Sequence, residues 1–270
     1  MQRHFHKMHG LGNDFVIVDA RPKSGNAAFA VTPSLARAIA DRRTGIGCDQ
    51  LIVLDASDRA DLRMRIWNPD GGEVESCGNA TRCVVALTGA TTIETAGGVL
   101  CGGAIDGEVE VTLVEPRFGW ADIPLADPMD TNPLPMAWDD LDQPLALNVG
   151  NPHLVFFVAD ADAVPLDLLG PRIEADPAFP ERINVNVAEV TTTGLKLRTW
   201  ERGTGLTLAC GTGACAAAVA AIASKRAASP VRVDMPGGSL TIAWAPGEAI
   251  RMRGQATHVF EGEIDLDALA

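Results

Sequence analysis

Two cysteines in this chain stand in near-copies of one short phrase, and each phrase opens a segment with helical character. The first phrase is Cys77-Gly78-Asn79 and the second is Cys210-Gly211-Thr212. A cysteine at a helix start can have its thiolate stabilised by unpaired backbone N–H groups and by the helix dipole. Two such sites in one chain predict a paired acid and base.

Such a pair suits proton transfer at a carbon atom that lies between two sulfurs. One thiolate would remove the proton from one face, and the opposite thiol would return a proton to the other face. Because two thiolates in one dry pocket repel each other, the pair should hold a single proton. No lysine lies in a pyridoxal phosphate phrase, so we expect no cofactor and predict that two helix N-termini stabilise the charge beside the substrate carboxylate.

Other uses of cysteine remain open at this point. Free cysteine is commonly buried and inert, and we expect this of Cys48, Cys83, Cys101 and Cys215. The chain has no Cys-x-x-Cys and no paired histidine spacing typical of zinc sites, so we predict no metal site. A thiol protein that binds metal or senses oxidation is the alternative from a different functional class.

Short strand patterns dominate the chain, and three helices stand among them. The predicted helices run from Pro33, with Thr32 as N-cap, to about Arg43, from Gly78 to Leu87 and from Gly211 to about Arg226. The last is small and apolar on nearly every face, which indicates a helix wrapped by other elements. The predicted strands are 15–18, 51–54, 62–66, 109–113, 154–158, 195–198, 231–233, 240–244 and 250–253.

The order of features in the first half returns in the second. Gly12-Asn13-Asp14 leads into a strand before Cys77, and Gly150-Asn151-Pro152 leads into one before Cys210. Between the halves, residues 116–144 are rich in proline and indicate a linker or an edge excursion. We predict an α+β fold of two pseudo-symmetric domains, each a mixed or antiparallel sheet around a central helix, comprising residues 1–116, which 256–270 could join, and 117–255.

Charge and hydrophobic composition limit the classes of partner that the protein can bind. The 270 residues carry a formal net charge of −13, so the protein should repel nucleic acid and anionic membranes, and we expect neither as a partner. No stretch approaches the roughly 20 apolar residues of a membrane span, and the first residues lack an apolar signal core. We expect a cytoplasmic protein acting on a small molecule.

Several phrases, in order over nearly the full chain, closely resemble those of the diaminopimelate epimerase family. The phrases are 8–15, 45–50, 68–83, 150–153, 181–185 and 201–215. The resemblance implies cofactor-independent conversion of LL- to meso-2,6-diaminopimelate, on the route to lysine and peptidoglycan precursors, by a homodimer. A proline or hydroxyproline racemase of the same two-cysteine architecture is the nearest rival.

The resemblance also implies roles for individual residues. Cys77 and Cys210 match the catalytic thiols, and His153 and Glu201 are candidates to position them. The residues matching the substrate pocket are Asn13, Gln50, Asn68, Gly78, Asn79, Asn151, Asn184, Glu201, Arg202, Gly211 and Thr212. Neutral amides and an arginine fork suit a substrate with two zwitterionic heads.

Overall fold

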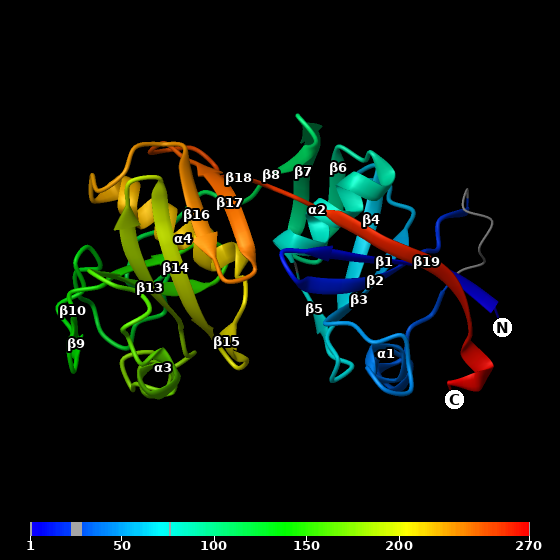
Figure 1. Ribbon diagram of the computed structural model, residues 1–270, viewed down its shortest axis with the longest axis horizontal. Coiled ribbons are helices and arrows are strands. Elements are labelled where there is room, and N and C mark those ends of the chain that lie inside the picture. Colours follow the sequence, from blue (N-terminus) through cyan, green and yellow to red (C-terminus); the bar gives the residue numbers. More distant parts are fainter. Residues whose placement is uncertain (1, 23–28, 76, 270) are drawn as a thin grey trace. The chain divides into compact units, whose positions relative to one another are not determined.

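The computed structural model describes residues 2–22, 29–75 and 77–269, and the chain divides into two compact units (Figure 1). Unit 1 comprises Met1–Val111 with Gly254–Ala270, and unit 2 comprises Thr112–Arg253. No helix in the described ranges is long and apolar enough to cross a membrane.

Unit 1 combines a mixed sheet with two helices. Its helices are α1 (Pro33–Ala40) and α2 (Gly78–Thr88). Its strands are β1 (Gln2–Gly10), β2 (Asn13–Asp19), β3 (Gln50–Asp55), β4 (Leu62–Trp67), β5 (Glu73–Val74), β6 (Thr92–Thr95), β7 (Gly98–Ile105), β8 (Glu108–Thr112) and β19 (Thr257–Asp265), and a 3-10 turn, η2 (Leu266–Ala268), follows β19.

Unit 2 also combines strands with two helices in the described ranges, and its β9 and β10 form a separate two-stranded sheet. Its helices are α3 (Leu166–Glu174) and α4 (Gly211–Ala223). Its strands are β9 (Ala137–Trp138), β10 (Leu141–Asp142), β11 (Leu145–Asn148), β12 (Pro152–Val158), β13 (Asn184–Thr191), β14 (Gly194–Glu201), β15 (Gly205–Thr207), β16 (Val231–Met235), β17 (Gly238–Ala243) and β18 (Arg251–Gly254).

The strand pairings of unit 1 recur, with the same sense, in unit 2. The pairs β1–β2, β3–β4, β4–β5 and β6–β7 are antiparallel, as are β11–β12, β13–β14, β14–β15 and β16–β17. The pairs β2–β3 and β4–β6 are parallel, as are β12–β13 and β14–β16. The repeated topology confirms the predicted pseudo-symmetric α+β fold.

Strand registers identify equivalent positions in the two units. In unit 1, Phe15 on β2 lies opposite Gln50 on β3, and Leu51 on β3 lies opposite Trp67 on β4. In unit 2, His153 on β12 lies opposite Asn184 on β13, and Val185 on β13 lies opposite Trp200 on β14. Gln50 is therefore the counterpart of Asn184, and Trp67 is the counterpart of Trp200. The residues that follow the two tryptophans, Asn68 and Glu201, are counterparts as well.

Each unit holds one central helix whose N-cap is a cysteine. Cys77 and Cys210 both have extended backbone, with φ of −149° and −120°. Helix α2 packs against β1, β2, β7 and β19, and α4 packs against strands β11 to β14, β16 and β17. Residues 213–221 of α4 are all buried, so the Ala-rich helix is enclosed by strands as predicted (Figure 1).

The helices differ from the sequence prediction at three places, and several strands, including β1 and β19, were not predicted. Helix α1 ends at Ala40 rather than near Arg43, and α4 ends at Ala223 because Lys225 adopts a left-handed φ of 59°. Helix α3 was not predicted, since Gly170 and Pro171 lie inside it and normally disfavour a helix. A Cβ on Gly170 would lie 2.5 Å from the ring of Trp200, so the glycine permits close packing.

The proline-rich segment is more than a linker. It belongs to unit 2, and its Ile123, Leu125 and Leu134 are buried in the same core as Leu166 and Ile173 of α3. The prolines suit irregular backbone, while the apolar residues between them cover the sheet.

Candidate active site

In unit 1, three predicted site residues meet at the start of α2. The sulfur of Cys77 lies 3.9 Å from Oδ1 of Asn13. Nδ2 of Asn79 donates a hydrogen bond to the same oxygen at 3.3 Å. Asn13 begins β2, directly after a tight turn in which Gly12 has a φ of 86°. The turn brings the amide to the helix N-terminus, where Cys77 and Gly78 begin the first turn.

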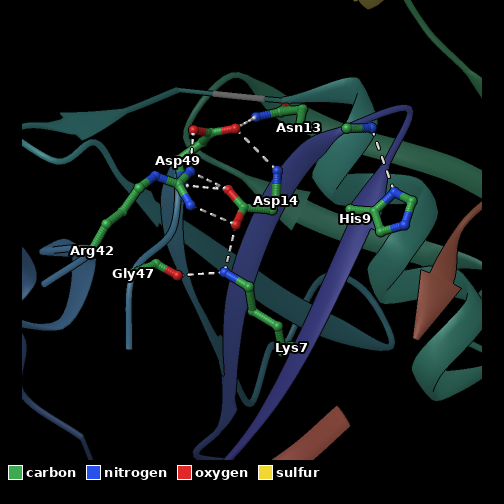
Figure 2. A network of polar contacts seen from close by, with 8 residues as sticks. Lys7, His9, Asn13, Asp14, Arg42, Gly47 and Asp49 are labelled. Carbon is green, nitrogen blue, oxygen red and sulfur yellow. Dashed lines mark hydrogen bonds and ion pairs between the residues drawn. The ribbon is translucent and has the colours of Figure 1, made fainter. Parts of the chain in front are cut away.

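A charged network holds the other side of the Asn13 amide (Figure 2). Nδ2 of Asn13 donates to Oδ2 of Asp49 at 2.9 Å. Arg42 bridges Asp49 at 2.7 Å and Asp14 at 2.6 Å, while Lys7 contacts Asp14 and the carbonyl oxygen of Gly47. Burial alone would raise the pKa of Asp14, but hydrogen bonds from Arg42 and Lys7 outweigh it and hold that pKa well below its ordinary value.

A second amide pair lies at the facing ends of β3 and β4. Nε2 of Gln50 donates to Oδ1 of Asn68 at 2.9 Å. Oε1 of Gln50 is buried and has no hydrogen-bond partner among the described residues. A buried acceptor without a donor costs about 1–3 kcal/mol, so this oxygen is suited to receive an N–H or ammonium group from a ligand.

In unit 2, the sulfur of Cys210 sits inside the first turn of α4. It accepts a hydrogen bond from the backbone N–H of Gly213 at 3.3 Å and lies 3.5 Å from Oγ1 of Thr212. The thiol is buried. Burial, followed by the negative charge of Glu201, raises the pKa of Cys210 well above its ordinary value, and the contacts with Thr212 and Gly213 only partly offset this. Cys210 is therefore a protonated thiol at neutral pH.

Glu201 is the residue that acts most directly on this thiol. It ends β14, and its carboxylate affects the pKa of Cys210 both through its charge and through a side-chain hydrogen bond. Oγ1 of Thr207 donates to Oε1 of Glu201 at 2.6 Å, which fixes the carboxylate beside the helix start. Thr207 was not predicted as a site residue.

Asn184 and Arg202 are joined through the backbone. The N–H of Arg202 donates to Oδ1 of Asn184 at 2.9 Å, and Nδ2 of Asn184 donates to the carbonyl oxygen of Pro152 at 2.8 Å. The Arg202 guanidinium donates one N–H to the carbonyl oxygen of Glu181 at 2.9 Å. The segments that carry Asn151 and Arg202 are thereby held together.

Arg202 and Asn151 line an open cavity of about 350 Å³ within unit 2. Its wall also includes Arg117, Asn148 and the carboxylate-bearing Asp122 and Glu181. The two guanidinium groups can bind a carboxylate in a fork-like manner, while the acidic and amide oxygens can accept from an ammonium group. The cavity therefore has the donors and acceptors that an amino acid head requires.

His153 is buried between two amides. Its Nε2 lies 2.9 Å from Oδ1 of Asn151, and its Nδ1 lies 3.1 Å from Nδ2 of Asn186. Because Nδ2 of Asn186 is a donor, Nδ1 accepts and the proton is assigned to Nε2. Burial, with a smaller effect of the Arg202 charge, lowers the pKa of His153 to about 3, so the ring is neutral. Both ring nitrogens are occupied by amides, so an effect of His153 on Cys210 has to pass through other residues.

Asn186 is such a residue, and sequence reasoning missed it. Its Oδ1 accepts from Oγ1 of Thr199 at 2.9 Å, and its Nδ2 donates to the carbonyl oxygen of Leu154 at 2.8 Å. A Cβ on Gly213 would lie 2.7 Å from Oδ1 of Asn186, so this amide packs against the first turn of α4. Asn186 follows Asn184 with the period of two that places side chains on one strand face, and this signal could have identified it.

Asp49 and Arg82 were also missed. Asp49 lies within the phrase 45–50 noted above, next to Gln50. Nη2 of Arg82 donates to Oδ1 of Asn79 at 2.8 Å, and Arg82 is fully buried in α2. An arginine in a buried helical position is a sequence signal for such a contact, because charged side chains are rarely buried without a partner.

The prediction of four inert core cysteines is wrong for one of them. Cys48, Cys83 and Cys215 are buried, but Cys101 on β7 is exposed. Burial raises the pKa of Cys48 to about 11 and that of Cys83 to about 12, so these thiols stay protonated and unreactive.

Comparison with known proteins agrees with these observations. The family model described as diaminopimelate epimerase matches residues 5–113 and 145–259. A protein of Rhizorhabdus wittichii named diaminopimelate epimerase is 62% identical over 270 residues, which are 99% of this chain and 97% of that protein. One of Zymomonas mobilis with the same name is 52% identical over 264 residues, which are 97% of each chain.

Solved structures with far lower identity share the fold. A hydroxyproline epimerase from Agrobacterium vitis, solved with bound trans-4-hydroxy-L-proline, has a TM-score of 0.66 at 15% identity, covering 97% of this chain and 91% of that one. A phenazine biosynthesis protein of the PhzF family from Bacillus anthracis has a TM-score of 0.67 at 17% identity, covering 98% and 99%. From the matched residues and the full-length relatives, the chain belongs to the diaminopimelate epimerase family.

Proposed function

We propose that this protein interconverts LL- and meso-2,6-diaminopimelate without a cofactor, as the names of its full-length relatives indicate. The observation that carries the proposal is the cysteine N-cap of one enclosed helix in each unit, Cys77 on α2 and Cys210 on α4. The product would serve lysine and peptidoglycan precursor synthesis.

In the proposed mechanism one cysteine removes the α-proton and the other returns a proton to the opposite face. This requires one thiolate and one thiol at the start of each turnover. The raised pKa of Cys210 supports assigning it the thiol role in the resting enzyme, with Cys77 as the base for one isomer. In the reverse direction Cys210 is the base and the proton starts on Cys77, whose sulfur can donate to Oδ1 of Asn13. Once substrate binds, Glu201 is placed to influence transfer at Cys210 through its hydrogen bond.

The reacting carboxylate would bind at the helix N-termini. Backbone N–H groups in the first turns of α2 and α4, at Gly78, Asn79, Gly211 and Thr212, are unpaired in the helices themselves. Donors at these places stabilise the negative charge that develops when the α-proton leaves. Because no prosthetic group shares that charge in this proposal, the helix N-termini carry the main electrostatic stabilisation.

The distal amino acid head would be held by amides, a carboxylate and a guanidinium. The unsatisfied Oε1 of Gln50 supports an ammonium-binding role, and Arg202 on the unit 2 cavity supports a carboxylate-binding role. The remaining proposed members of this set are Asn13, Asn68, Asn151, Asn184 and Glu201. A racemase for proline would need no such set, which favours diaminopimelate over the rival substrates.

The setting of the enzyme is part of the proposal. We place it in the cytoplasm as a homodimer that acts on a small molecule, without nucleic acid or membrane partners. The net charge of −13 supports the exclusion of nucleic acid. Sedimentation of the purified protein at several concentrations would test the dimer.

The decisive experiment is a chiral assay on LL-diaminopimelate in deuterated water, with no added cofactor or metal. The wild-type protein should form the meso isomer with deuterium at the α-carbon, and should leave L-proline unchanged. Cys77→Ala and Cys210→Ala should each abolish epimerisation, while Cys101→Ala, which changes an exposed thiol, should retain it. Full epimerisation by either of the first two variants would refute the two-cysteine mechanism.

A further inference from the structure

Three histidines and a glutamate gather on the ladder that joins the first strand of the chain to the last. We call His4, His6, His258 and Glu261 the terminal histidine cluster. His4 and His6 lie on β1, and His258 and Glu261 lie on β19. The two strands are antiparallel neighbours in unit 1, with His6 opposite Glu261 and His258 opposite Met8 (Figure 1). None of these residues belongs to the candidate active site.

A bulge in this ladder brings the ring of His258 to that of His6. The register shifts between Lys7 and Met8, and such an irregularity re-aims nearby side chains. Nδ1 of His6 then lies 3.2 Å from Nε2 of His258, and the ring centroids are 5.4 Å apart. The ring of His4 lies 4.8 Å from that of His6 in an edge-to-face arrangement.

Three ligand atoms of this cluster lie close enough together to share one metal ion. Oε2 of Glu261 lies 3.5 Å from Nδ1 of His6 and 3.6 Å from Nε2 of His4. The ligand atoms of His6, His258 and Glu261 all lie within 4.8 Å of one another. Zinc bonds of about 2.0–2.1 Å to nitrogen and oxygen place tetrahedral ligand atoms roughly 3.3–3.4 Å apart, close to the three shortest separations found here.

The types of ligand atom and the exposure of these side chains also suit a zinc-type divalent ion. Imidazole nitrogen and carboxylate oxygen are the usual zinc ligands, and imidazole also suits cobalt, nickel and copper. The side chains of His4 and Glu261 are 41% and 60% exposed, and that of His6 is 19% exposed. An ion can therefore enter from solvent, while the inner histidine is already held in place by its neighbours.

We propose that the terminal histidine cluster binds one divalent transition-metal ion of the zinc type, which ties β1 to β19. His6, His258 and Glu261 supply three ligands, and a water molecule or His4, after a rotation of its side chain, supplies the fourth. The sequence predicted no metal site because the ligands come from opposite ends of the chain. The site is separate from the proposed epimerase chemistry, so neither proposal depends on the other.

Binding of Zn²⁺ to the full-length, chelator-stripped protein tests the proposal by calorimetry. We expect one tight ion per chain and a higher thermal midpoint in the presence of Zn²⁺, because a ligand that binds only the folded state stabilises it. His6→Gln and His258→Ala should each weaken Zn²⁺ binding by roughly 100-fold, because losing a direct ligand costs at least as much as losing a residue that only orients a ligand. Glu261→Gln should weaken Zn²⁺ binding as well. Circular dichroism of each variant without metal checks that it is folded.

Two controls separate this site from binding elsewhere. His9→Ala changes a histidine on β1 that instead accepts from the N–H of Gly12, and Glu248→Gln makes the same charge change as Glu261→Gln at an exposed position in unit 2. Both should bind Zn²⁺ like the wild type. Co²⁺ should give the visible ligand-field bands of a tetrahedral site without a sulfur charge-transfer band. No tight binding by the wild type, undiminished binding by folded His6→Gln, or a sulfur band that dominates would each overturn the proposal.

Discussion

The side-chain oxygen of Asn13 lies 3.9 Å from the sulfur of Cys77, and this orientation is set from the other end of the amide. Nδ2 of Asn13 donates to the Asp49 carboxylate, which can only accept when ionised. The amide therefore cannot turn its nitrogen toward Cys77 without losing that hydrogen bond. Asp49 thus decides whether Cys77 faces an acceptor or a donor.

Asp49→Asn should misorient Asn13 while keeping the size of the side chain. A neutral amide can donate as well as accept, so Asn13 becomes able to rotate and present Nδ2 to Cys77. We expect kcat/KM for epimerisation to fall roughly 10- to 100-fold, the scale of a small misplacement of a catalytic group. The acidic limb of the pH profile should also move to lower pH, since a donor beside the sulfur stabilises the thiolate.

The control for this variant is Asp58→Asn, which makes the same change at an exposed position in unit 1. It should leave both the rate and the pH profile unchanged. A wild-type pH profile in Asp49→Asn would show that Asp49 has only a structural role.

Gly213→Ala should destabilise the start of α4. The added Cβ would meet Oδ1 of Asn186 at 2.7 Å and Oγ1 of Thr199 at 2.9 Å, and both residues are buried and hydrogen-bonded to each other. Overpacking of this kind costs about 1–3 kcal/mol, which exceeds the gain of up to about 1 kcal/mol from replacing glycine in a helix. The net loss should appear in urea unfolding followed by circular dichroism.

Gly103→Ala provides the matched comparison, because nothing lies within 4 Å of a Cβ built there. Its midpoint in urea should stay near that of the wild type. Equal stability of Gly213→Ala and the wild type would mean that the Asn186 network can move aside at little cost.

Local features of the sequence predicted the parts of the site that depend on one segment. The cysteine phrases specified two helix N-caps because the glycine and small polar residues act within a single turn. The Ala-rich composition of α4 predicted its enclosure by strands because no face of it is polar. The matching sequence phrases in the two halves predicted that the two units share their strand pairings, since equivalent segments pair in the same order.

Features that depend on two distant segments were not predictable in this way. The pairing of β1 with β19 joins the two ends of the chain, so no local pattern reveals the terminal histidine cluster. The contact of His153 with Asn186 depends on the parallel pairing of β12 with β13. Cys101 is exposed. The apolar character of cysteine predicts burial, and only the structure shows which face of β7 is covered.

His153 should make the protein sensitive to mild acid. Its pKa of about 3 in the folded state lies below the ordinary value of about 6.5 in an unfolded chain. The unfolded state therefore binds a proton first, and stability is lost as pH falls from about 6.5 toward 3. Between pH 6.5 and 4.5 this single group should cost up to roughly 2–3 kcal/mol.

The measurement is the free energy of unfolding in urea at a series of pH values, followed by tryptophan fluorescence. Trp120, Trp138, Trp200 and Trp244 lie in unit 2, so the signal reports mainly on the unit that contains His153. His153→Gln should lower stability at pH 7 but flatten its dependence on pH in this window. An unchanged slope in the variant would contradict the assignment of a neutral, buried His153.

Glu201→Gln should lower the pKa of Cys210 without restoring its ordinary value. Burial is the largest cause of the raised pKa, and the charge of Glu201 comes second, so removing the charge relieves only part of the shift. The test is the pH dependence of iodoacetamide modification at Cys210, mapped by mass spectrometry, with exposed Cys101 as an internal reference for alkylation in each sample. The half-maximal rate should occur at lower pH in Glu201→Gln than in the wild type, while Glu248→Gln should match the wild type. A profile that moves to higher pH would mean that Glu201 stabilises the thiolate, and the proposed thiol role of Cys210 in the resting enzyme would then be wrong.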